Sequence, residues 1–78
     1  MKLVEGKLYK LKRGIAEATS ILDLRQVKRI EKGKTVMLVR IAQTTHRDIT
    51  DITIMCGKEL ILAKFTPINY PFWFERMP

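Results

Sequence analysis

The sequence predicts an all-β protein: a single small antiparallel barrel or a strongly curved meander sheet of five or six strands, with little or no helix. Three observations predict this class. Short segments rich in β-branched residues recur along the chain, and several of them alternate between apolar and polar positions. The four glycines stand 8 to 24 residues apart, a spacing that suits turns between strands. Seventy-eight residues build one core, so residues 1–78 are expected to form a single domain.

The N-terminal segments are expected to supply the first strands of this sheet. Residues 3–12 are expected to form a strand in which Leu3, Tyr9 and Leu11 lie on one face, and Val4 and Leu8 lie on the other. Residues 15–24 support two interpretations. Their spacing and composition allow a helix of about two or three turns. The alternative, which we prefer, is a strand at residues 21–24.

Two hairpins are expected in the middle of the chain. Residues 27–31 lead into the strongest strand, residues 35–42, and Gly33 between them can take a positive φ and close the turn. Residues 49–55 alternate and then turn through a Cys-Gly pair into residues 59–65. The last of these strands is apolar on both faces, as a central strand is.

The tail holds five of the six aromatic residues within ten positions. Residues 66–71 predict a turn-rich break, and residues 72–74 a short strand with Phe72 and Phe74 on one face and Trp73 on the other. One interpretation is that this tail closes the barrel. The other is that it contacts a second copy or a partner, because Trp and Tyr are favoured interface anchors. The candidate interface residues are Tyr70, Phe72, Trp73 and Phe74.

Composition sets the expected architecture and compartment. A small sheet curls to remove its edges, so an SH3-like barrel, or a curved sheet like half of a pleckstrin-homology domain, fits the expected strands. The single cysteine excludes an internal disulfide and favours a reducing compartment. No apolar run approaches the length of a membrane span, and the first residues do not form a secretory signal. We therefore expect a cytoplasmic protein with no membrane partner.

The sequence offers little for catalysis, metals or cofactors. With one His and one Cys, it lacks the four ligands of a structural zinc site. His46, Asp48 and Asp51 lie in a segment that also fits an ordinary polar loop. Cys56 with His46 is the one Cys/His pair, and Cys56 fits better as a small buried side chain. The glycines are too far apart for a phosphate loop. We expect no enzyme, no metal and no cofactor.

Charge is the most informative feature of the chain. Its formal net charge is +7, of which residues 1–34 carry +6 and residues 35–78 carry +1. The N-terminal excess falls in three clusters at residues 10–13, 25–29 and 32–34. If the first strand lies beside residues 27–31, these clusters merge into one positive face. Such a face attracts polyanions and gains from counterion release when it binds phosphates.

The residues expected to hold an anionic ligand are mostly cations of this half of the chain. Tyr9 is added to them because it stands between two lysines and is placed to stack on a base. The candidate ligand-binding residues are Lys7, Tyr9, Lys10, Lys12, Arg13, Arg25, Lys28 and Arg29.

Two functional hypotheses follow, with solubility alone as a third explanation of the charge. The first is a non-enzymatic basic module that binds a phosphate-bearing partner, either a nucleic acid or a nucleotide. The alternative is a small interaction or inhibitor protein, of the kind that viruses and mobile elements encode. It would be homo-oligomeric and would dock on an acidic host protein through charge and the aromatic tail. The segregation of aromatics from charge along the sequence favours this alternative, but we rank the first hypothesis ahead. A minimal enzyme ranks last.

Overall fold

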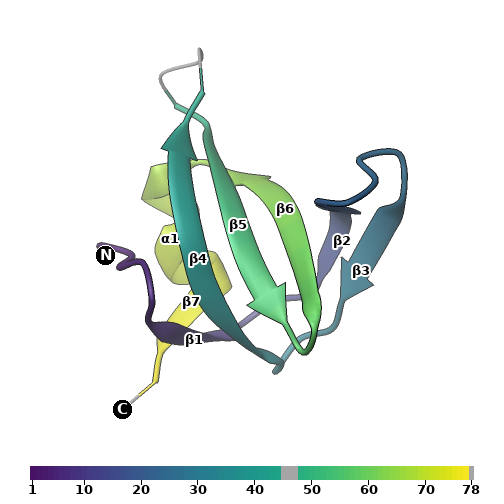
Figure 1. The fold of residues 1–78 in the computed structure, drawn as a ribbon. Coiled ribbons are helices and arrows are strands. Elements are labelled where there is room, and N and C mark those ends of the chain that lie inside the picture. The colour runs from purple at the N-terminus through teal and green to yellow at the C-terminus, as the bar shows by residue number, and fades with distance from the viewer. Residues whose placement is uncertain (45–47, 78) are drawn as a thin grey trace.

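The computed structural model describes residues 1–44 and 48–77, which form one antiparallel sheet curled into a half-barrel (Figure 1). The strands are β1 (Leu8–Leu11), β2 (Ile15–Ser20), β3 (Val27–Ile30), β4 (Thr35–Gln43), β5 (Thr50–Cys56), β6 (Glu59–Phe65) and β7 (Phe74–Arg76). Their order across the sheet is β3-β2-β6-β5-β4-β1-β7. The predicted all-β class and strong curvature are confirmed, with seven strands in the described part of the chain rather than five or six.

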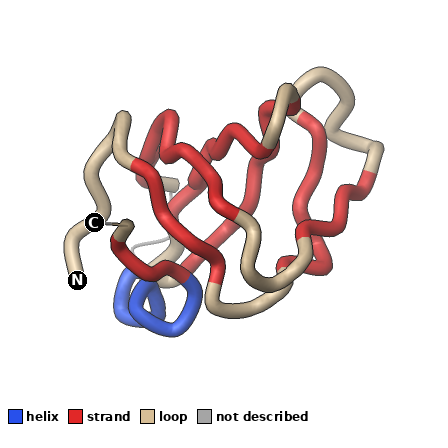
Figure 2. Tube along the Cα trace, turned by 90° about the horizontal axis from the view of Figure 1, so that it is seen from below, coloured by secondary structure: helices blue, strands red, loops and turns tan. Residues whose placement is uncertain are grey.

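The sheet curls without closing. β3 pairs with β2, and β7 pairs with β1, so these two strands form the opposite edges of the sheet. Two short helical turns, η1 (Pro67–Asn69) and α1 (Tyr70–Trp73), precede β7. In both ribbon views they lie on the same side of the molecule as the two chain ends (Figure 2).

The second predicted hairpin is confirmed in position and register. β5 and β6 pair along their full length, from Thr50 opposite Phe65 to Cys56 opposite Glu59. Gly57 in the connecting turn has φ +64°, which glycine adopts without steric cost. β6 is a central strand, since it pairs with β5 on one side and β2 on the other. Alternation explains its burial, because Ile61 and Ala63 face the core.

An aromatic cluster holds the core together. The Phe74 ring makes edge contacts with Phe65, Tyr9 and Tyr70, at centroid distances of 5.1, 6.0 and 6.3 Å. The Tyr70 hydroxyl is 2.6 Å from Thr50 Oγ1, so its polar end is satisfied inside the core. These contacts tie the last strand and the helical turn to β1 and β6. The tail therefore packs into the core, but it does not close the barrel as one of the two interpretations proposed, because β7 is an edge strand of an open sheet.

The first expected strand is shorter than its alternation suggests. β1 begins at Leu8, and the residues before it form a loop in which Leu3 is buried. The Val4 amide donates to the Tyr9 hydroxyl at 2.8 Å. β1 pairs with β4 and β7, so it does not lie beside β3. The expected merging of the cationic clusters depended on β1 and β3 being neighbours.

Both interpretations of residues 15–24 are wrong. Residues 15–20 are the strand β2, and residues 21–26 form the turn to β3. Ile15 and Ala18 pack into the core, and an irregularity in the pairing with β3 between them shifts the facing pattern away from strict alternation.

Gly33 does close a turn, but the turn is not a hairpin. Its φ is +90°, the left-handed backbone that the sequence predicted. However, β3 pairs with β2, whereas β4 pairs with β1 and β5. The turn at residues 31–34 therefore carries the chain from one edge strand to a central one.

The predicted strand at residues 72–74 is also wrong in part. Pro67 and Pro71 each stand at the start of a helical turn, where a fixed φ and a missing amide hydrogen cost least. The helical turn continues to Trp73, and the strand begins at Phe74. Phe72 and Phe74 therefore do not share a face: Phe72 is 55% exposed and Phe74 is 2% exposed.

A matched pair of substitutions tests this arrangement of the tail. Phe74→Leu removes ring contacts inside the core, and we expect it to lower the free energy of unfolding by about 1 to 2 kcal/mol. Phe72→Leu replaces an exposed ring and should change the free energy of unfolding by less than about 0.5 kcal/mol. Urea unfolding at a constant m-value measures both. Equal losses for the two variants would contradict the placement.

Candidate anion-binding site

Two segments from different parts of the chain are joined by backbone hydrogen bonds at one end of the half-barrel. The Gly33 amide donates to the Leu11 carbonyl at 2.8 Å, and the Leu11 amide donates to the Lys34 carbonyl at 2.9 Å. The turn at residues 31–34 therefore lies directly against the segment that leaves β1. The cations of both segments, Lys12 and Arg13 on one side and Lys32 and Lys34 on the other, are brought to the same region.

A cleft of about 260 Å³ continues this region toward the edge strand β3. Lys28, Arg29 and Lys34 line it, together with apolar Ile30 and Ile61. Lys34 belongs to the turn and also lines the cleft, so it links the two. We call the combined surface the cationic band and define it by Lys12, Arg13, Lys28, Arg29, Lys32 and Lys34.

The charge of the band is largely uncompensated. Lys28 pairs with Glu59 at 3.1 Å, and its side chain is only 28% exposed. The other five cations form no ion pair within the described residues. Glu31 and Glu59 line the cleft beside Lys28, Arg29 and Lys34, so cations exceed carboxylates there by one, and Lys12, Arg13 and Lys32 add three more positive charges to the band. Such an excess produces a positive potential that a polyanion would neutralise.

An exposed aromatic ring lies beside the band. The Arg13 guanidinium is 5.6 Å from the centroid of the Phe72 ring, within the range of a cation–π contact. The Lys12 ammonium donates to the Pro71 carbonyl at 2.8 Å, and the Lys12 amide donates to the Trp73 carbonyl. The helical turn α1 thus holds Phe72 next to two cations. Along the sequence these residues are about sixty positions apart, so no local pattern could have indicated this neighbourhood.

Four of the eight candidate ligand residues belong to the band, and four lie elsewhere. Tyr9 is 2% exposed, so its ring cannot stack on a base. Lys10 is on the outer face of β1, opposite Glu75. Lys7 lines a separate hollow with Arg76, and Arg25 pairs with Asp23 at 3.5 Å in the turn after β2. Lys32 and Lys34 belong to the cationic cluster at residues 32–34, but the candidate ligand residues predicted from the sequence do not include them.

The four interface candidates are divided by the fold. Tyr70 and Phe74 are buried, and half-buried Trp73 makes an edge contact with Phe65 at 5.4 Å between ring centroids. Only Phe72 among the four presents most of its ring to solvent. A homodimer or partner contact through the whole tail therefore loses most of its aromatic surface to the core.

The groups considered for catalysis and metal binding are only partly described. His46 lies outside the described residues, so neither its pairing with Cys56 nor its grouping with Asp48 and Asp51 is described. Cys56 is half-buried and lines the cleft, and Asp51 pairs with Lys64 at 3.2 Å. Within residues 1–44 and 48–77, no group of three or more His, Cys, Asp or Glu side chains is placed to hold a metal ion.

Gly14 provides a test of the close backbone contact between the segment after β1 and residues 30–32. A Cβ atom there would lie 3.3 Å from the Ile30 carbonyl oxygen and 3.6 Å from the Lys32 amide nitrogen, and both atoms belong to the backbone rather than to a flexible side chain. Gly→Ala at an unstrained, open position usually stabilises a protein. We expect Gly14→Ala to lower the free energy of unfolding instead, by about 1 kcal/mol. Urea unfolding checks the sign, and a stabilised variant would contradict the close packing.

Comparison with known proteins identified no relative of this chain. No family model matches the chain, and no similar curated protein or solved structure was found. In the part of the chain that the structure describes, no helix is long and apolar enough to cross a membrane. The functional conclusion is therefore drawn from the cationic band and the residues around it.

Proposed function

We propose that the protein is a non-enzymatic module that binds single-stranded nucleic acid through the cationic band, with Phe72 as a stacking platform. One observation carries this proposal. The hydrogen bonds between Leu11 and the turn at residues 33–34 bring cations without ion-pair partners in the described chain together beside an exposed aromatic ring. Solubility requires surface charge, but it does not require that charge to converge around an aromatic side chain.

The composition of the surface favours a single strand over a duplex. Phosphates would be held by the ammonium and guanidinium groups, which also release counterions. An unpaired base can stack on an exposed ring, whereas a base inside a duplex is covered on both faces. Phe72 is 55% exposed and is tethered through α1, so its ring is presented in a fixed position.

The alternative of an interaction protein that docks through the aromatic tail is less well supported. It needs Tyr70, Trp73 and Phe74 at a surface, and the core uses their rings instead. The segregation of aromatics from charge, which favoured this alternative along the sequence, no longer holds once Phe72 lies against Arg13.

Salt dependence gives the first test. Five unpaired cations would neutralise up to five phosphates, so log K for a twelve-residue oligo(dT) or oligo(U) should fall against log salt with a slope of about −3 to −4. Fluorescence anisotropy between about 50 and 200 mM KCl measures it. An affinity that does not change with salt would contradict the proposal.

Two exposed lysines provide a matched control for this titration. Lys32→Gln removes a cation of the band, and we expect a slope shallower by about 0.7 with a several-fold loss of affinity. Lys2→Gln removes the same charge from the N-terminal end, outside the band, and should leave the slope unchanged. Equal effects of both variants would mean that only net charge matters, and would reject a defined site.

The stacking role of Phe72 has a separate test. Phe72→Ala should lower the affinity for the single strand at least about fivefold, because a stacked base is worth about 1 to 3 kcal/mol. The slope against salt should not change, since no cation is removed. Binding of a twelve-base-pair duplex should be nearly unaffected. An equal loss on duplex and single strand would contradict the stacking role.

A further inference from the structure

A second surface, separate from Phe72 and the Lys12–Arg13 corner, stands at the end of the β2–β3 hairpin. Four apolar side chains are exposed within seven residues there, out of eleven exposed large hydrophobic side chains among the described residues. Leu22 is 94% exposed, more than any of the others, and Leu24 is 61% exposed. We call this surface the hairpin tip and define it by Ile21, Leu22, Leu24 and Val27. Clusters of this kind mark interaction sites more often than scattered single residues do.

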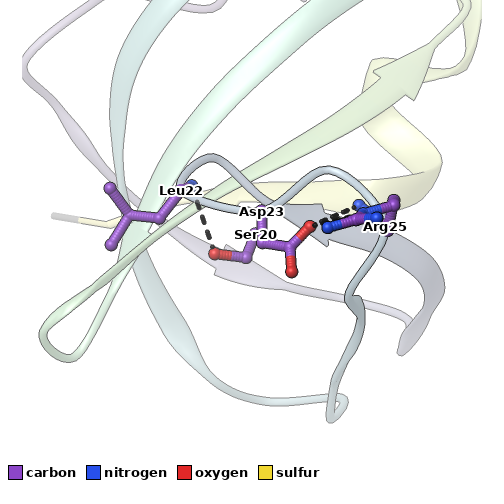
Figure 3. A network of polar contacts seen from close by, with 4 residues as sticks. All are labelled: Ser20, Leu22, Asp23 and Arg25. Atoms are coloured by element: carbon purple, nitrogen blue, oxygen red, sulfur yellow. Dashed lines mark hydrogen bonds and ion pairs between the residues drawn. The ribbon is translucent and has the colours of Figure 1, made fainter.

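The turn that carries these side chains is fixed by polar contacts (Figure 3). Ser20 Oγ accepts from the Leu22 amide at 3.3 Å. Asp23 Oδ1 accepts from the Arg25 amide at 3.0 Å and also lies 3.5 Å from Arg25 Nε. The Gln26 amide donates to the Asp23 carbonyl at 3.0 Å. The two leucines are therefore displayed on an ordered turn, and little conformational entropy would be lost on binding.

The strand next to the tip has a free edge. β3 pairs with β2 alone among the described strands, so one row of its backbone amides and carbonyls faces outward. An exposed edge of this kind can accept an added strand from another chain, with main-chain hydrogen bonds for affinity and side chains for specificity. Val27 and Arg29 are exposed on this strand and Ile30 is buried, and Lys28, Arg29 and Ile30 all line the cleft.

Charge decides what kind of chain fits this edge. The hairpin carries Arg25, Lys28 and Arg29 against two carboxylates, Glu17 on β2 and Asp23 in the turn, and Asp23 already pairs with Arg25. A second copy of the same hairpin would oppose like charges, which is unfavourable for directly paired strands. A lipid surface would satisfy the apolar side chains, but it cannot pair the backbone edge, and the tip has no aromatic interface anchor. A strand with carboxylates beside its apolar residues would match the exposed apolar side chains, the free edge of β3 and the positive charge of the hairpin.

We propose that the hairpin tip and the β3 edge form a docking site for an acidic protein segment. The segment adds as a strand to β3 and places carboxylates against Arg25 and Arg29. Its apolar side chains pack against Leu22 and Leu24. This site is an addition to the nucleic-acid surface, and it does not use Arg13, Lys32 or Phe72.

Selection from a displayed library of random twelve-residue peptides tests the proposal. Wild-type protein is the bait, and Leu22→Ser/Leu24→Ser is the counter-selection bait. Both leucines are exposed, so the double variant should keep the wild-type melting temperature, which is measured first. We expect enriched peptides that combine acidic and apolar residues. Synthetic copies should bind the double variant at least about thirtyfold more weakly, and shift amide NMR signals of residues 21–30.

The same experiment has clear contrary outcomes. Failure to enrich any peptide, or enrichment of basic or uncharged ones, overturns the proposal. Amide shifts that depend on protein concentration and map to residues 21–30 point to a second copy instead. Binding of the tip to vesicles with anionic lipid, lost in the double variant, points to a membrane surface. Oligonucleotide affinity of Leu22→Ser/Leu24→Ser should equal the wild-type value, so the two proposals succeed or fail separately.

Discussion

The arrangement of this protein depends on the backbone crossing between Leu11 and the turn at residues 33–34. Its two hydrogen bonds, at 2.8 and 2.9 Å, connect the end of β1 to the start of β4 and hold two cationic segments together. Like charges at that separation repel, even with salt screening. The crossing is stable because Leu11 and Val36, on either side of it, are almost fully buried, so apolar packing offsets the repulsion. The positive potential of the band is thus a consequence of core packing.

The aromatic tail has two different roles within a few residues. The helical turn α1 rotates the chain between Phe72 and Phe74, so that one ring remains in solvent and the other fills the core. Phe74 contacts three aromatic rings and joins the last strand to the first. Because this anchoring also fixes Pro71 and Trp73, which accept hydrogen bonds from Lys12, the exposed ring is held beside the band. A straight strand would have placed the Phe72 and Phe74 rings on one face.

The half-barrel presents its two proposed surfaces because it does not close. A closed barrel would have paired β3 on both sides and removed the free edge. Here the β2–β3 hairpin ends in the hydrogen-bonded turn at residues 21–26 (Figure 1), and residues of β3 line the cationic cleft. A nucleic acid and an acidic protein segment are both anionic, so they would compete for Arg29, which belongs to both surfaces. The remaining residues of each surface are separate.

Local patterns along the chain were sufficient to predict the all-β class, the strands β4, β5 and β6, the turns at Gly33 and Gly57, and the concentration of charge in the first thirty-four residues. Alternation, β-branching and glycine act through near neighbours, so a local pattern is sufficient for them. Long-range packing was needed to show that β1 pairs with β4 and β7, that residues 15–20 form a strand, and that Tyr9 is buried. It also placed Lys12 and Arg13 beside Lys32, Lys34 and Phe72. These outcomes depend on which distant segments share a core, and that is set by the burial of many side chains at once rather than by any pattern along the chain.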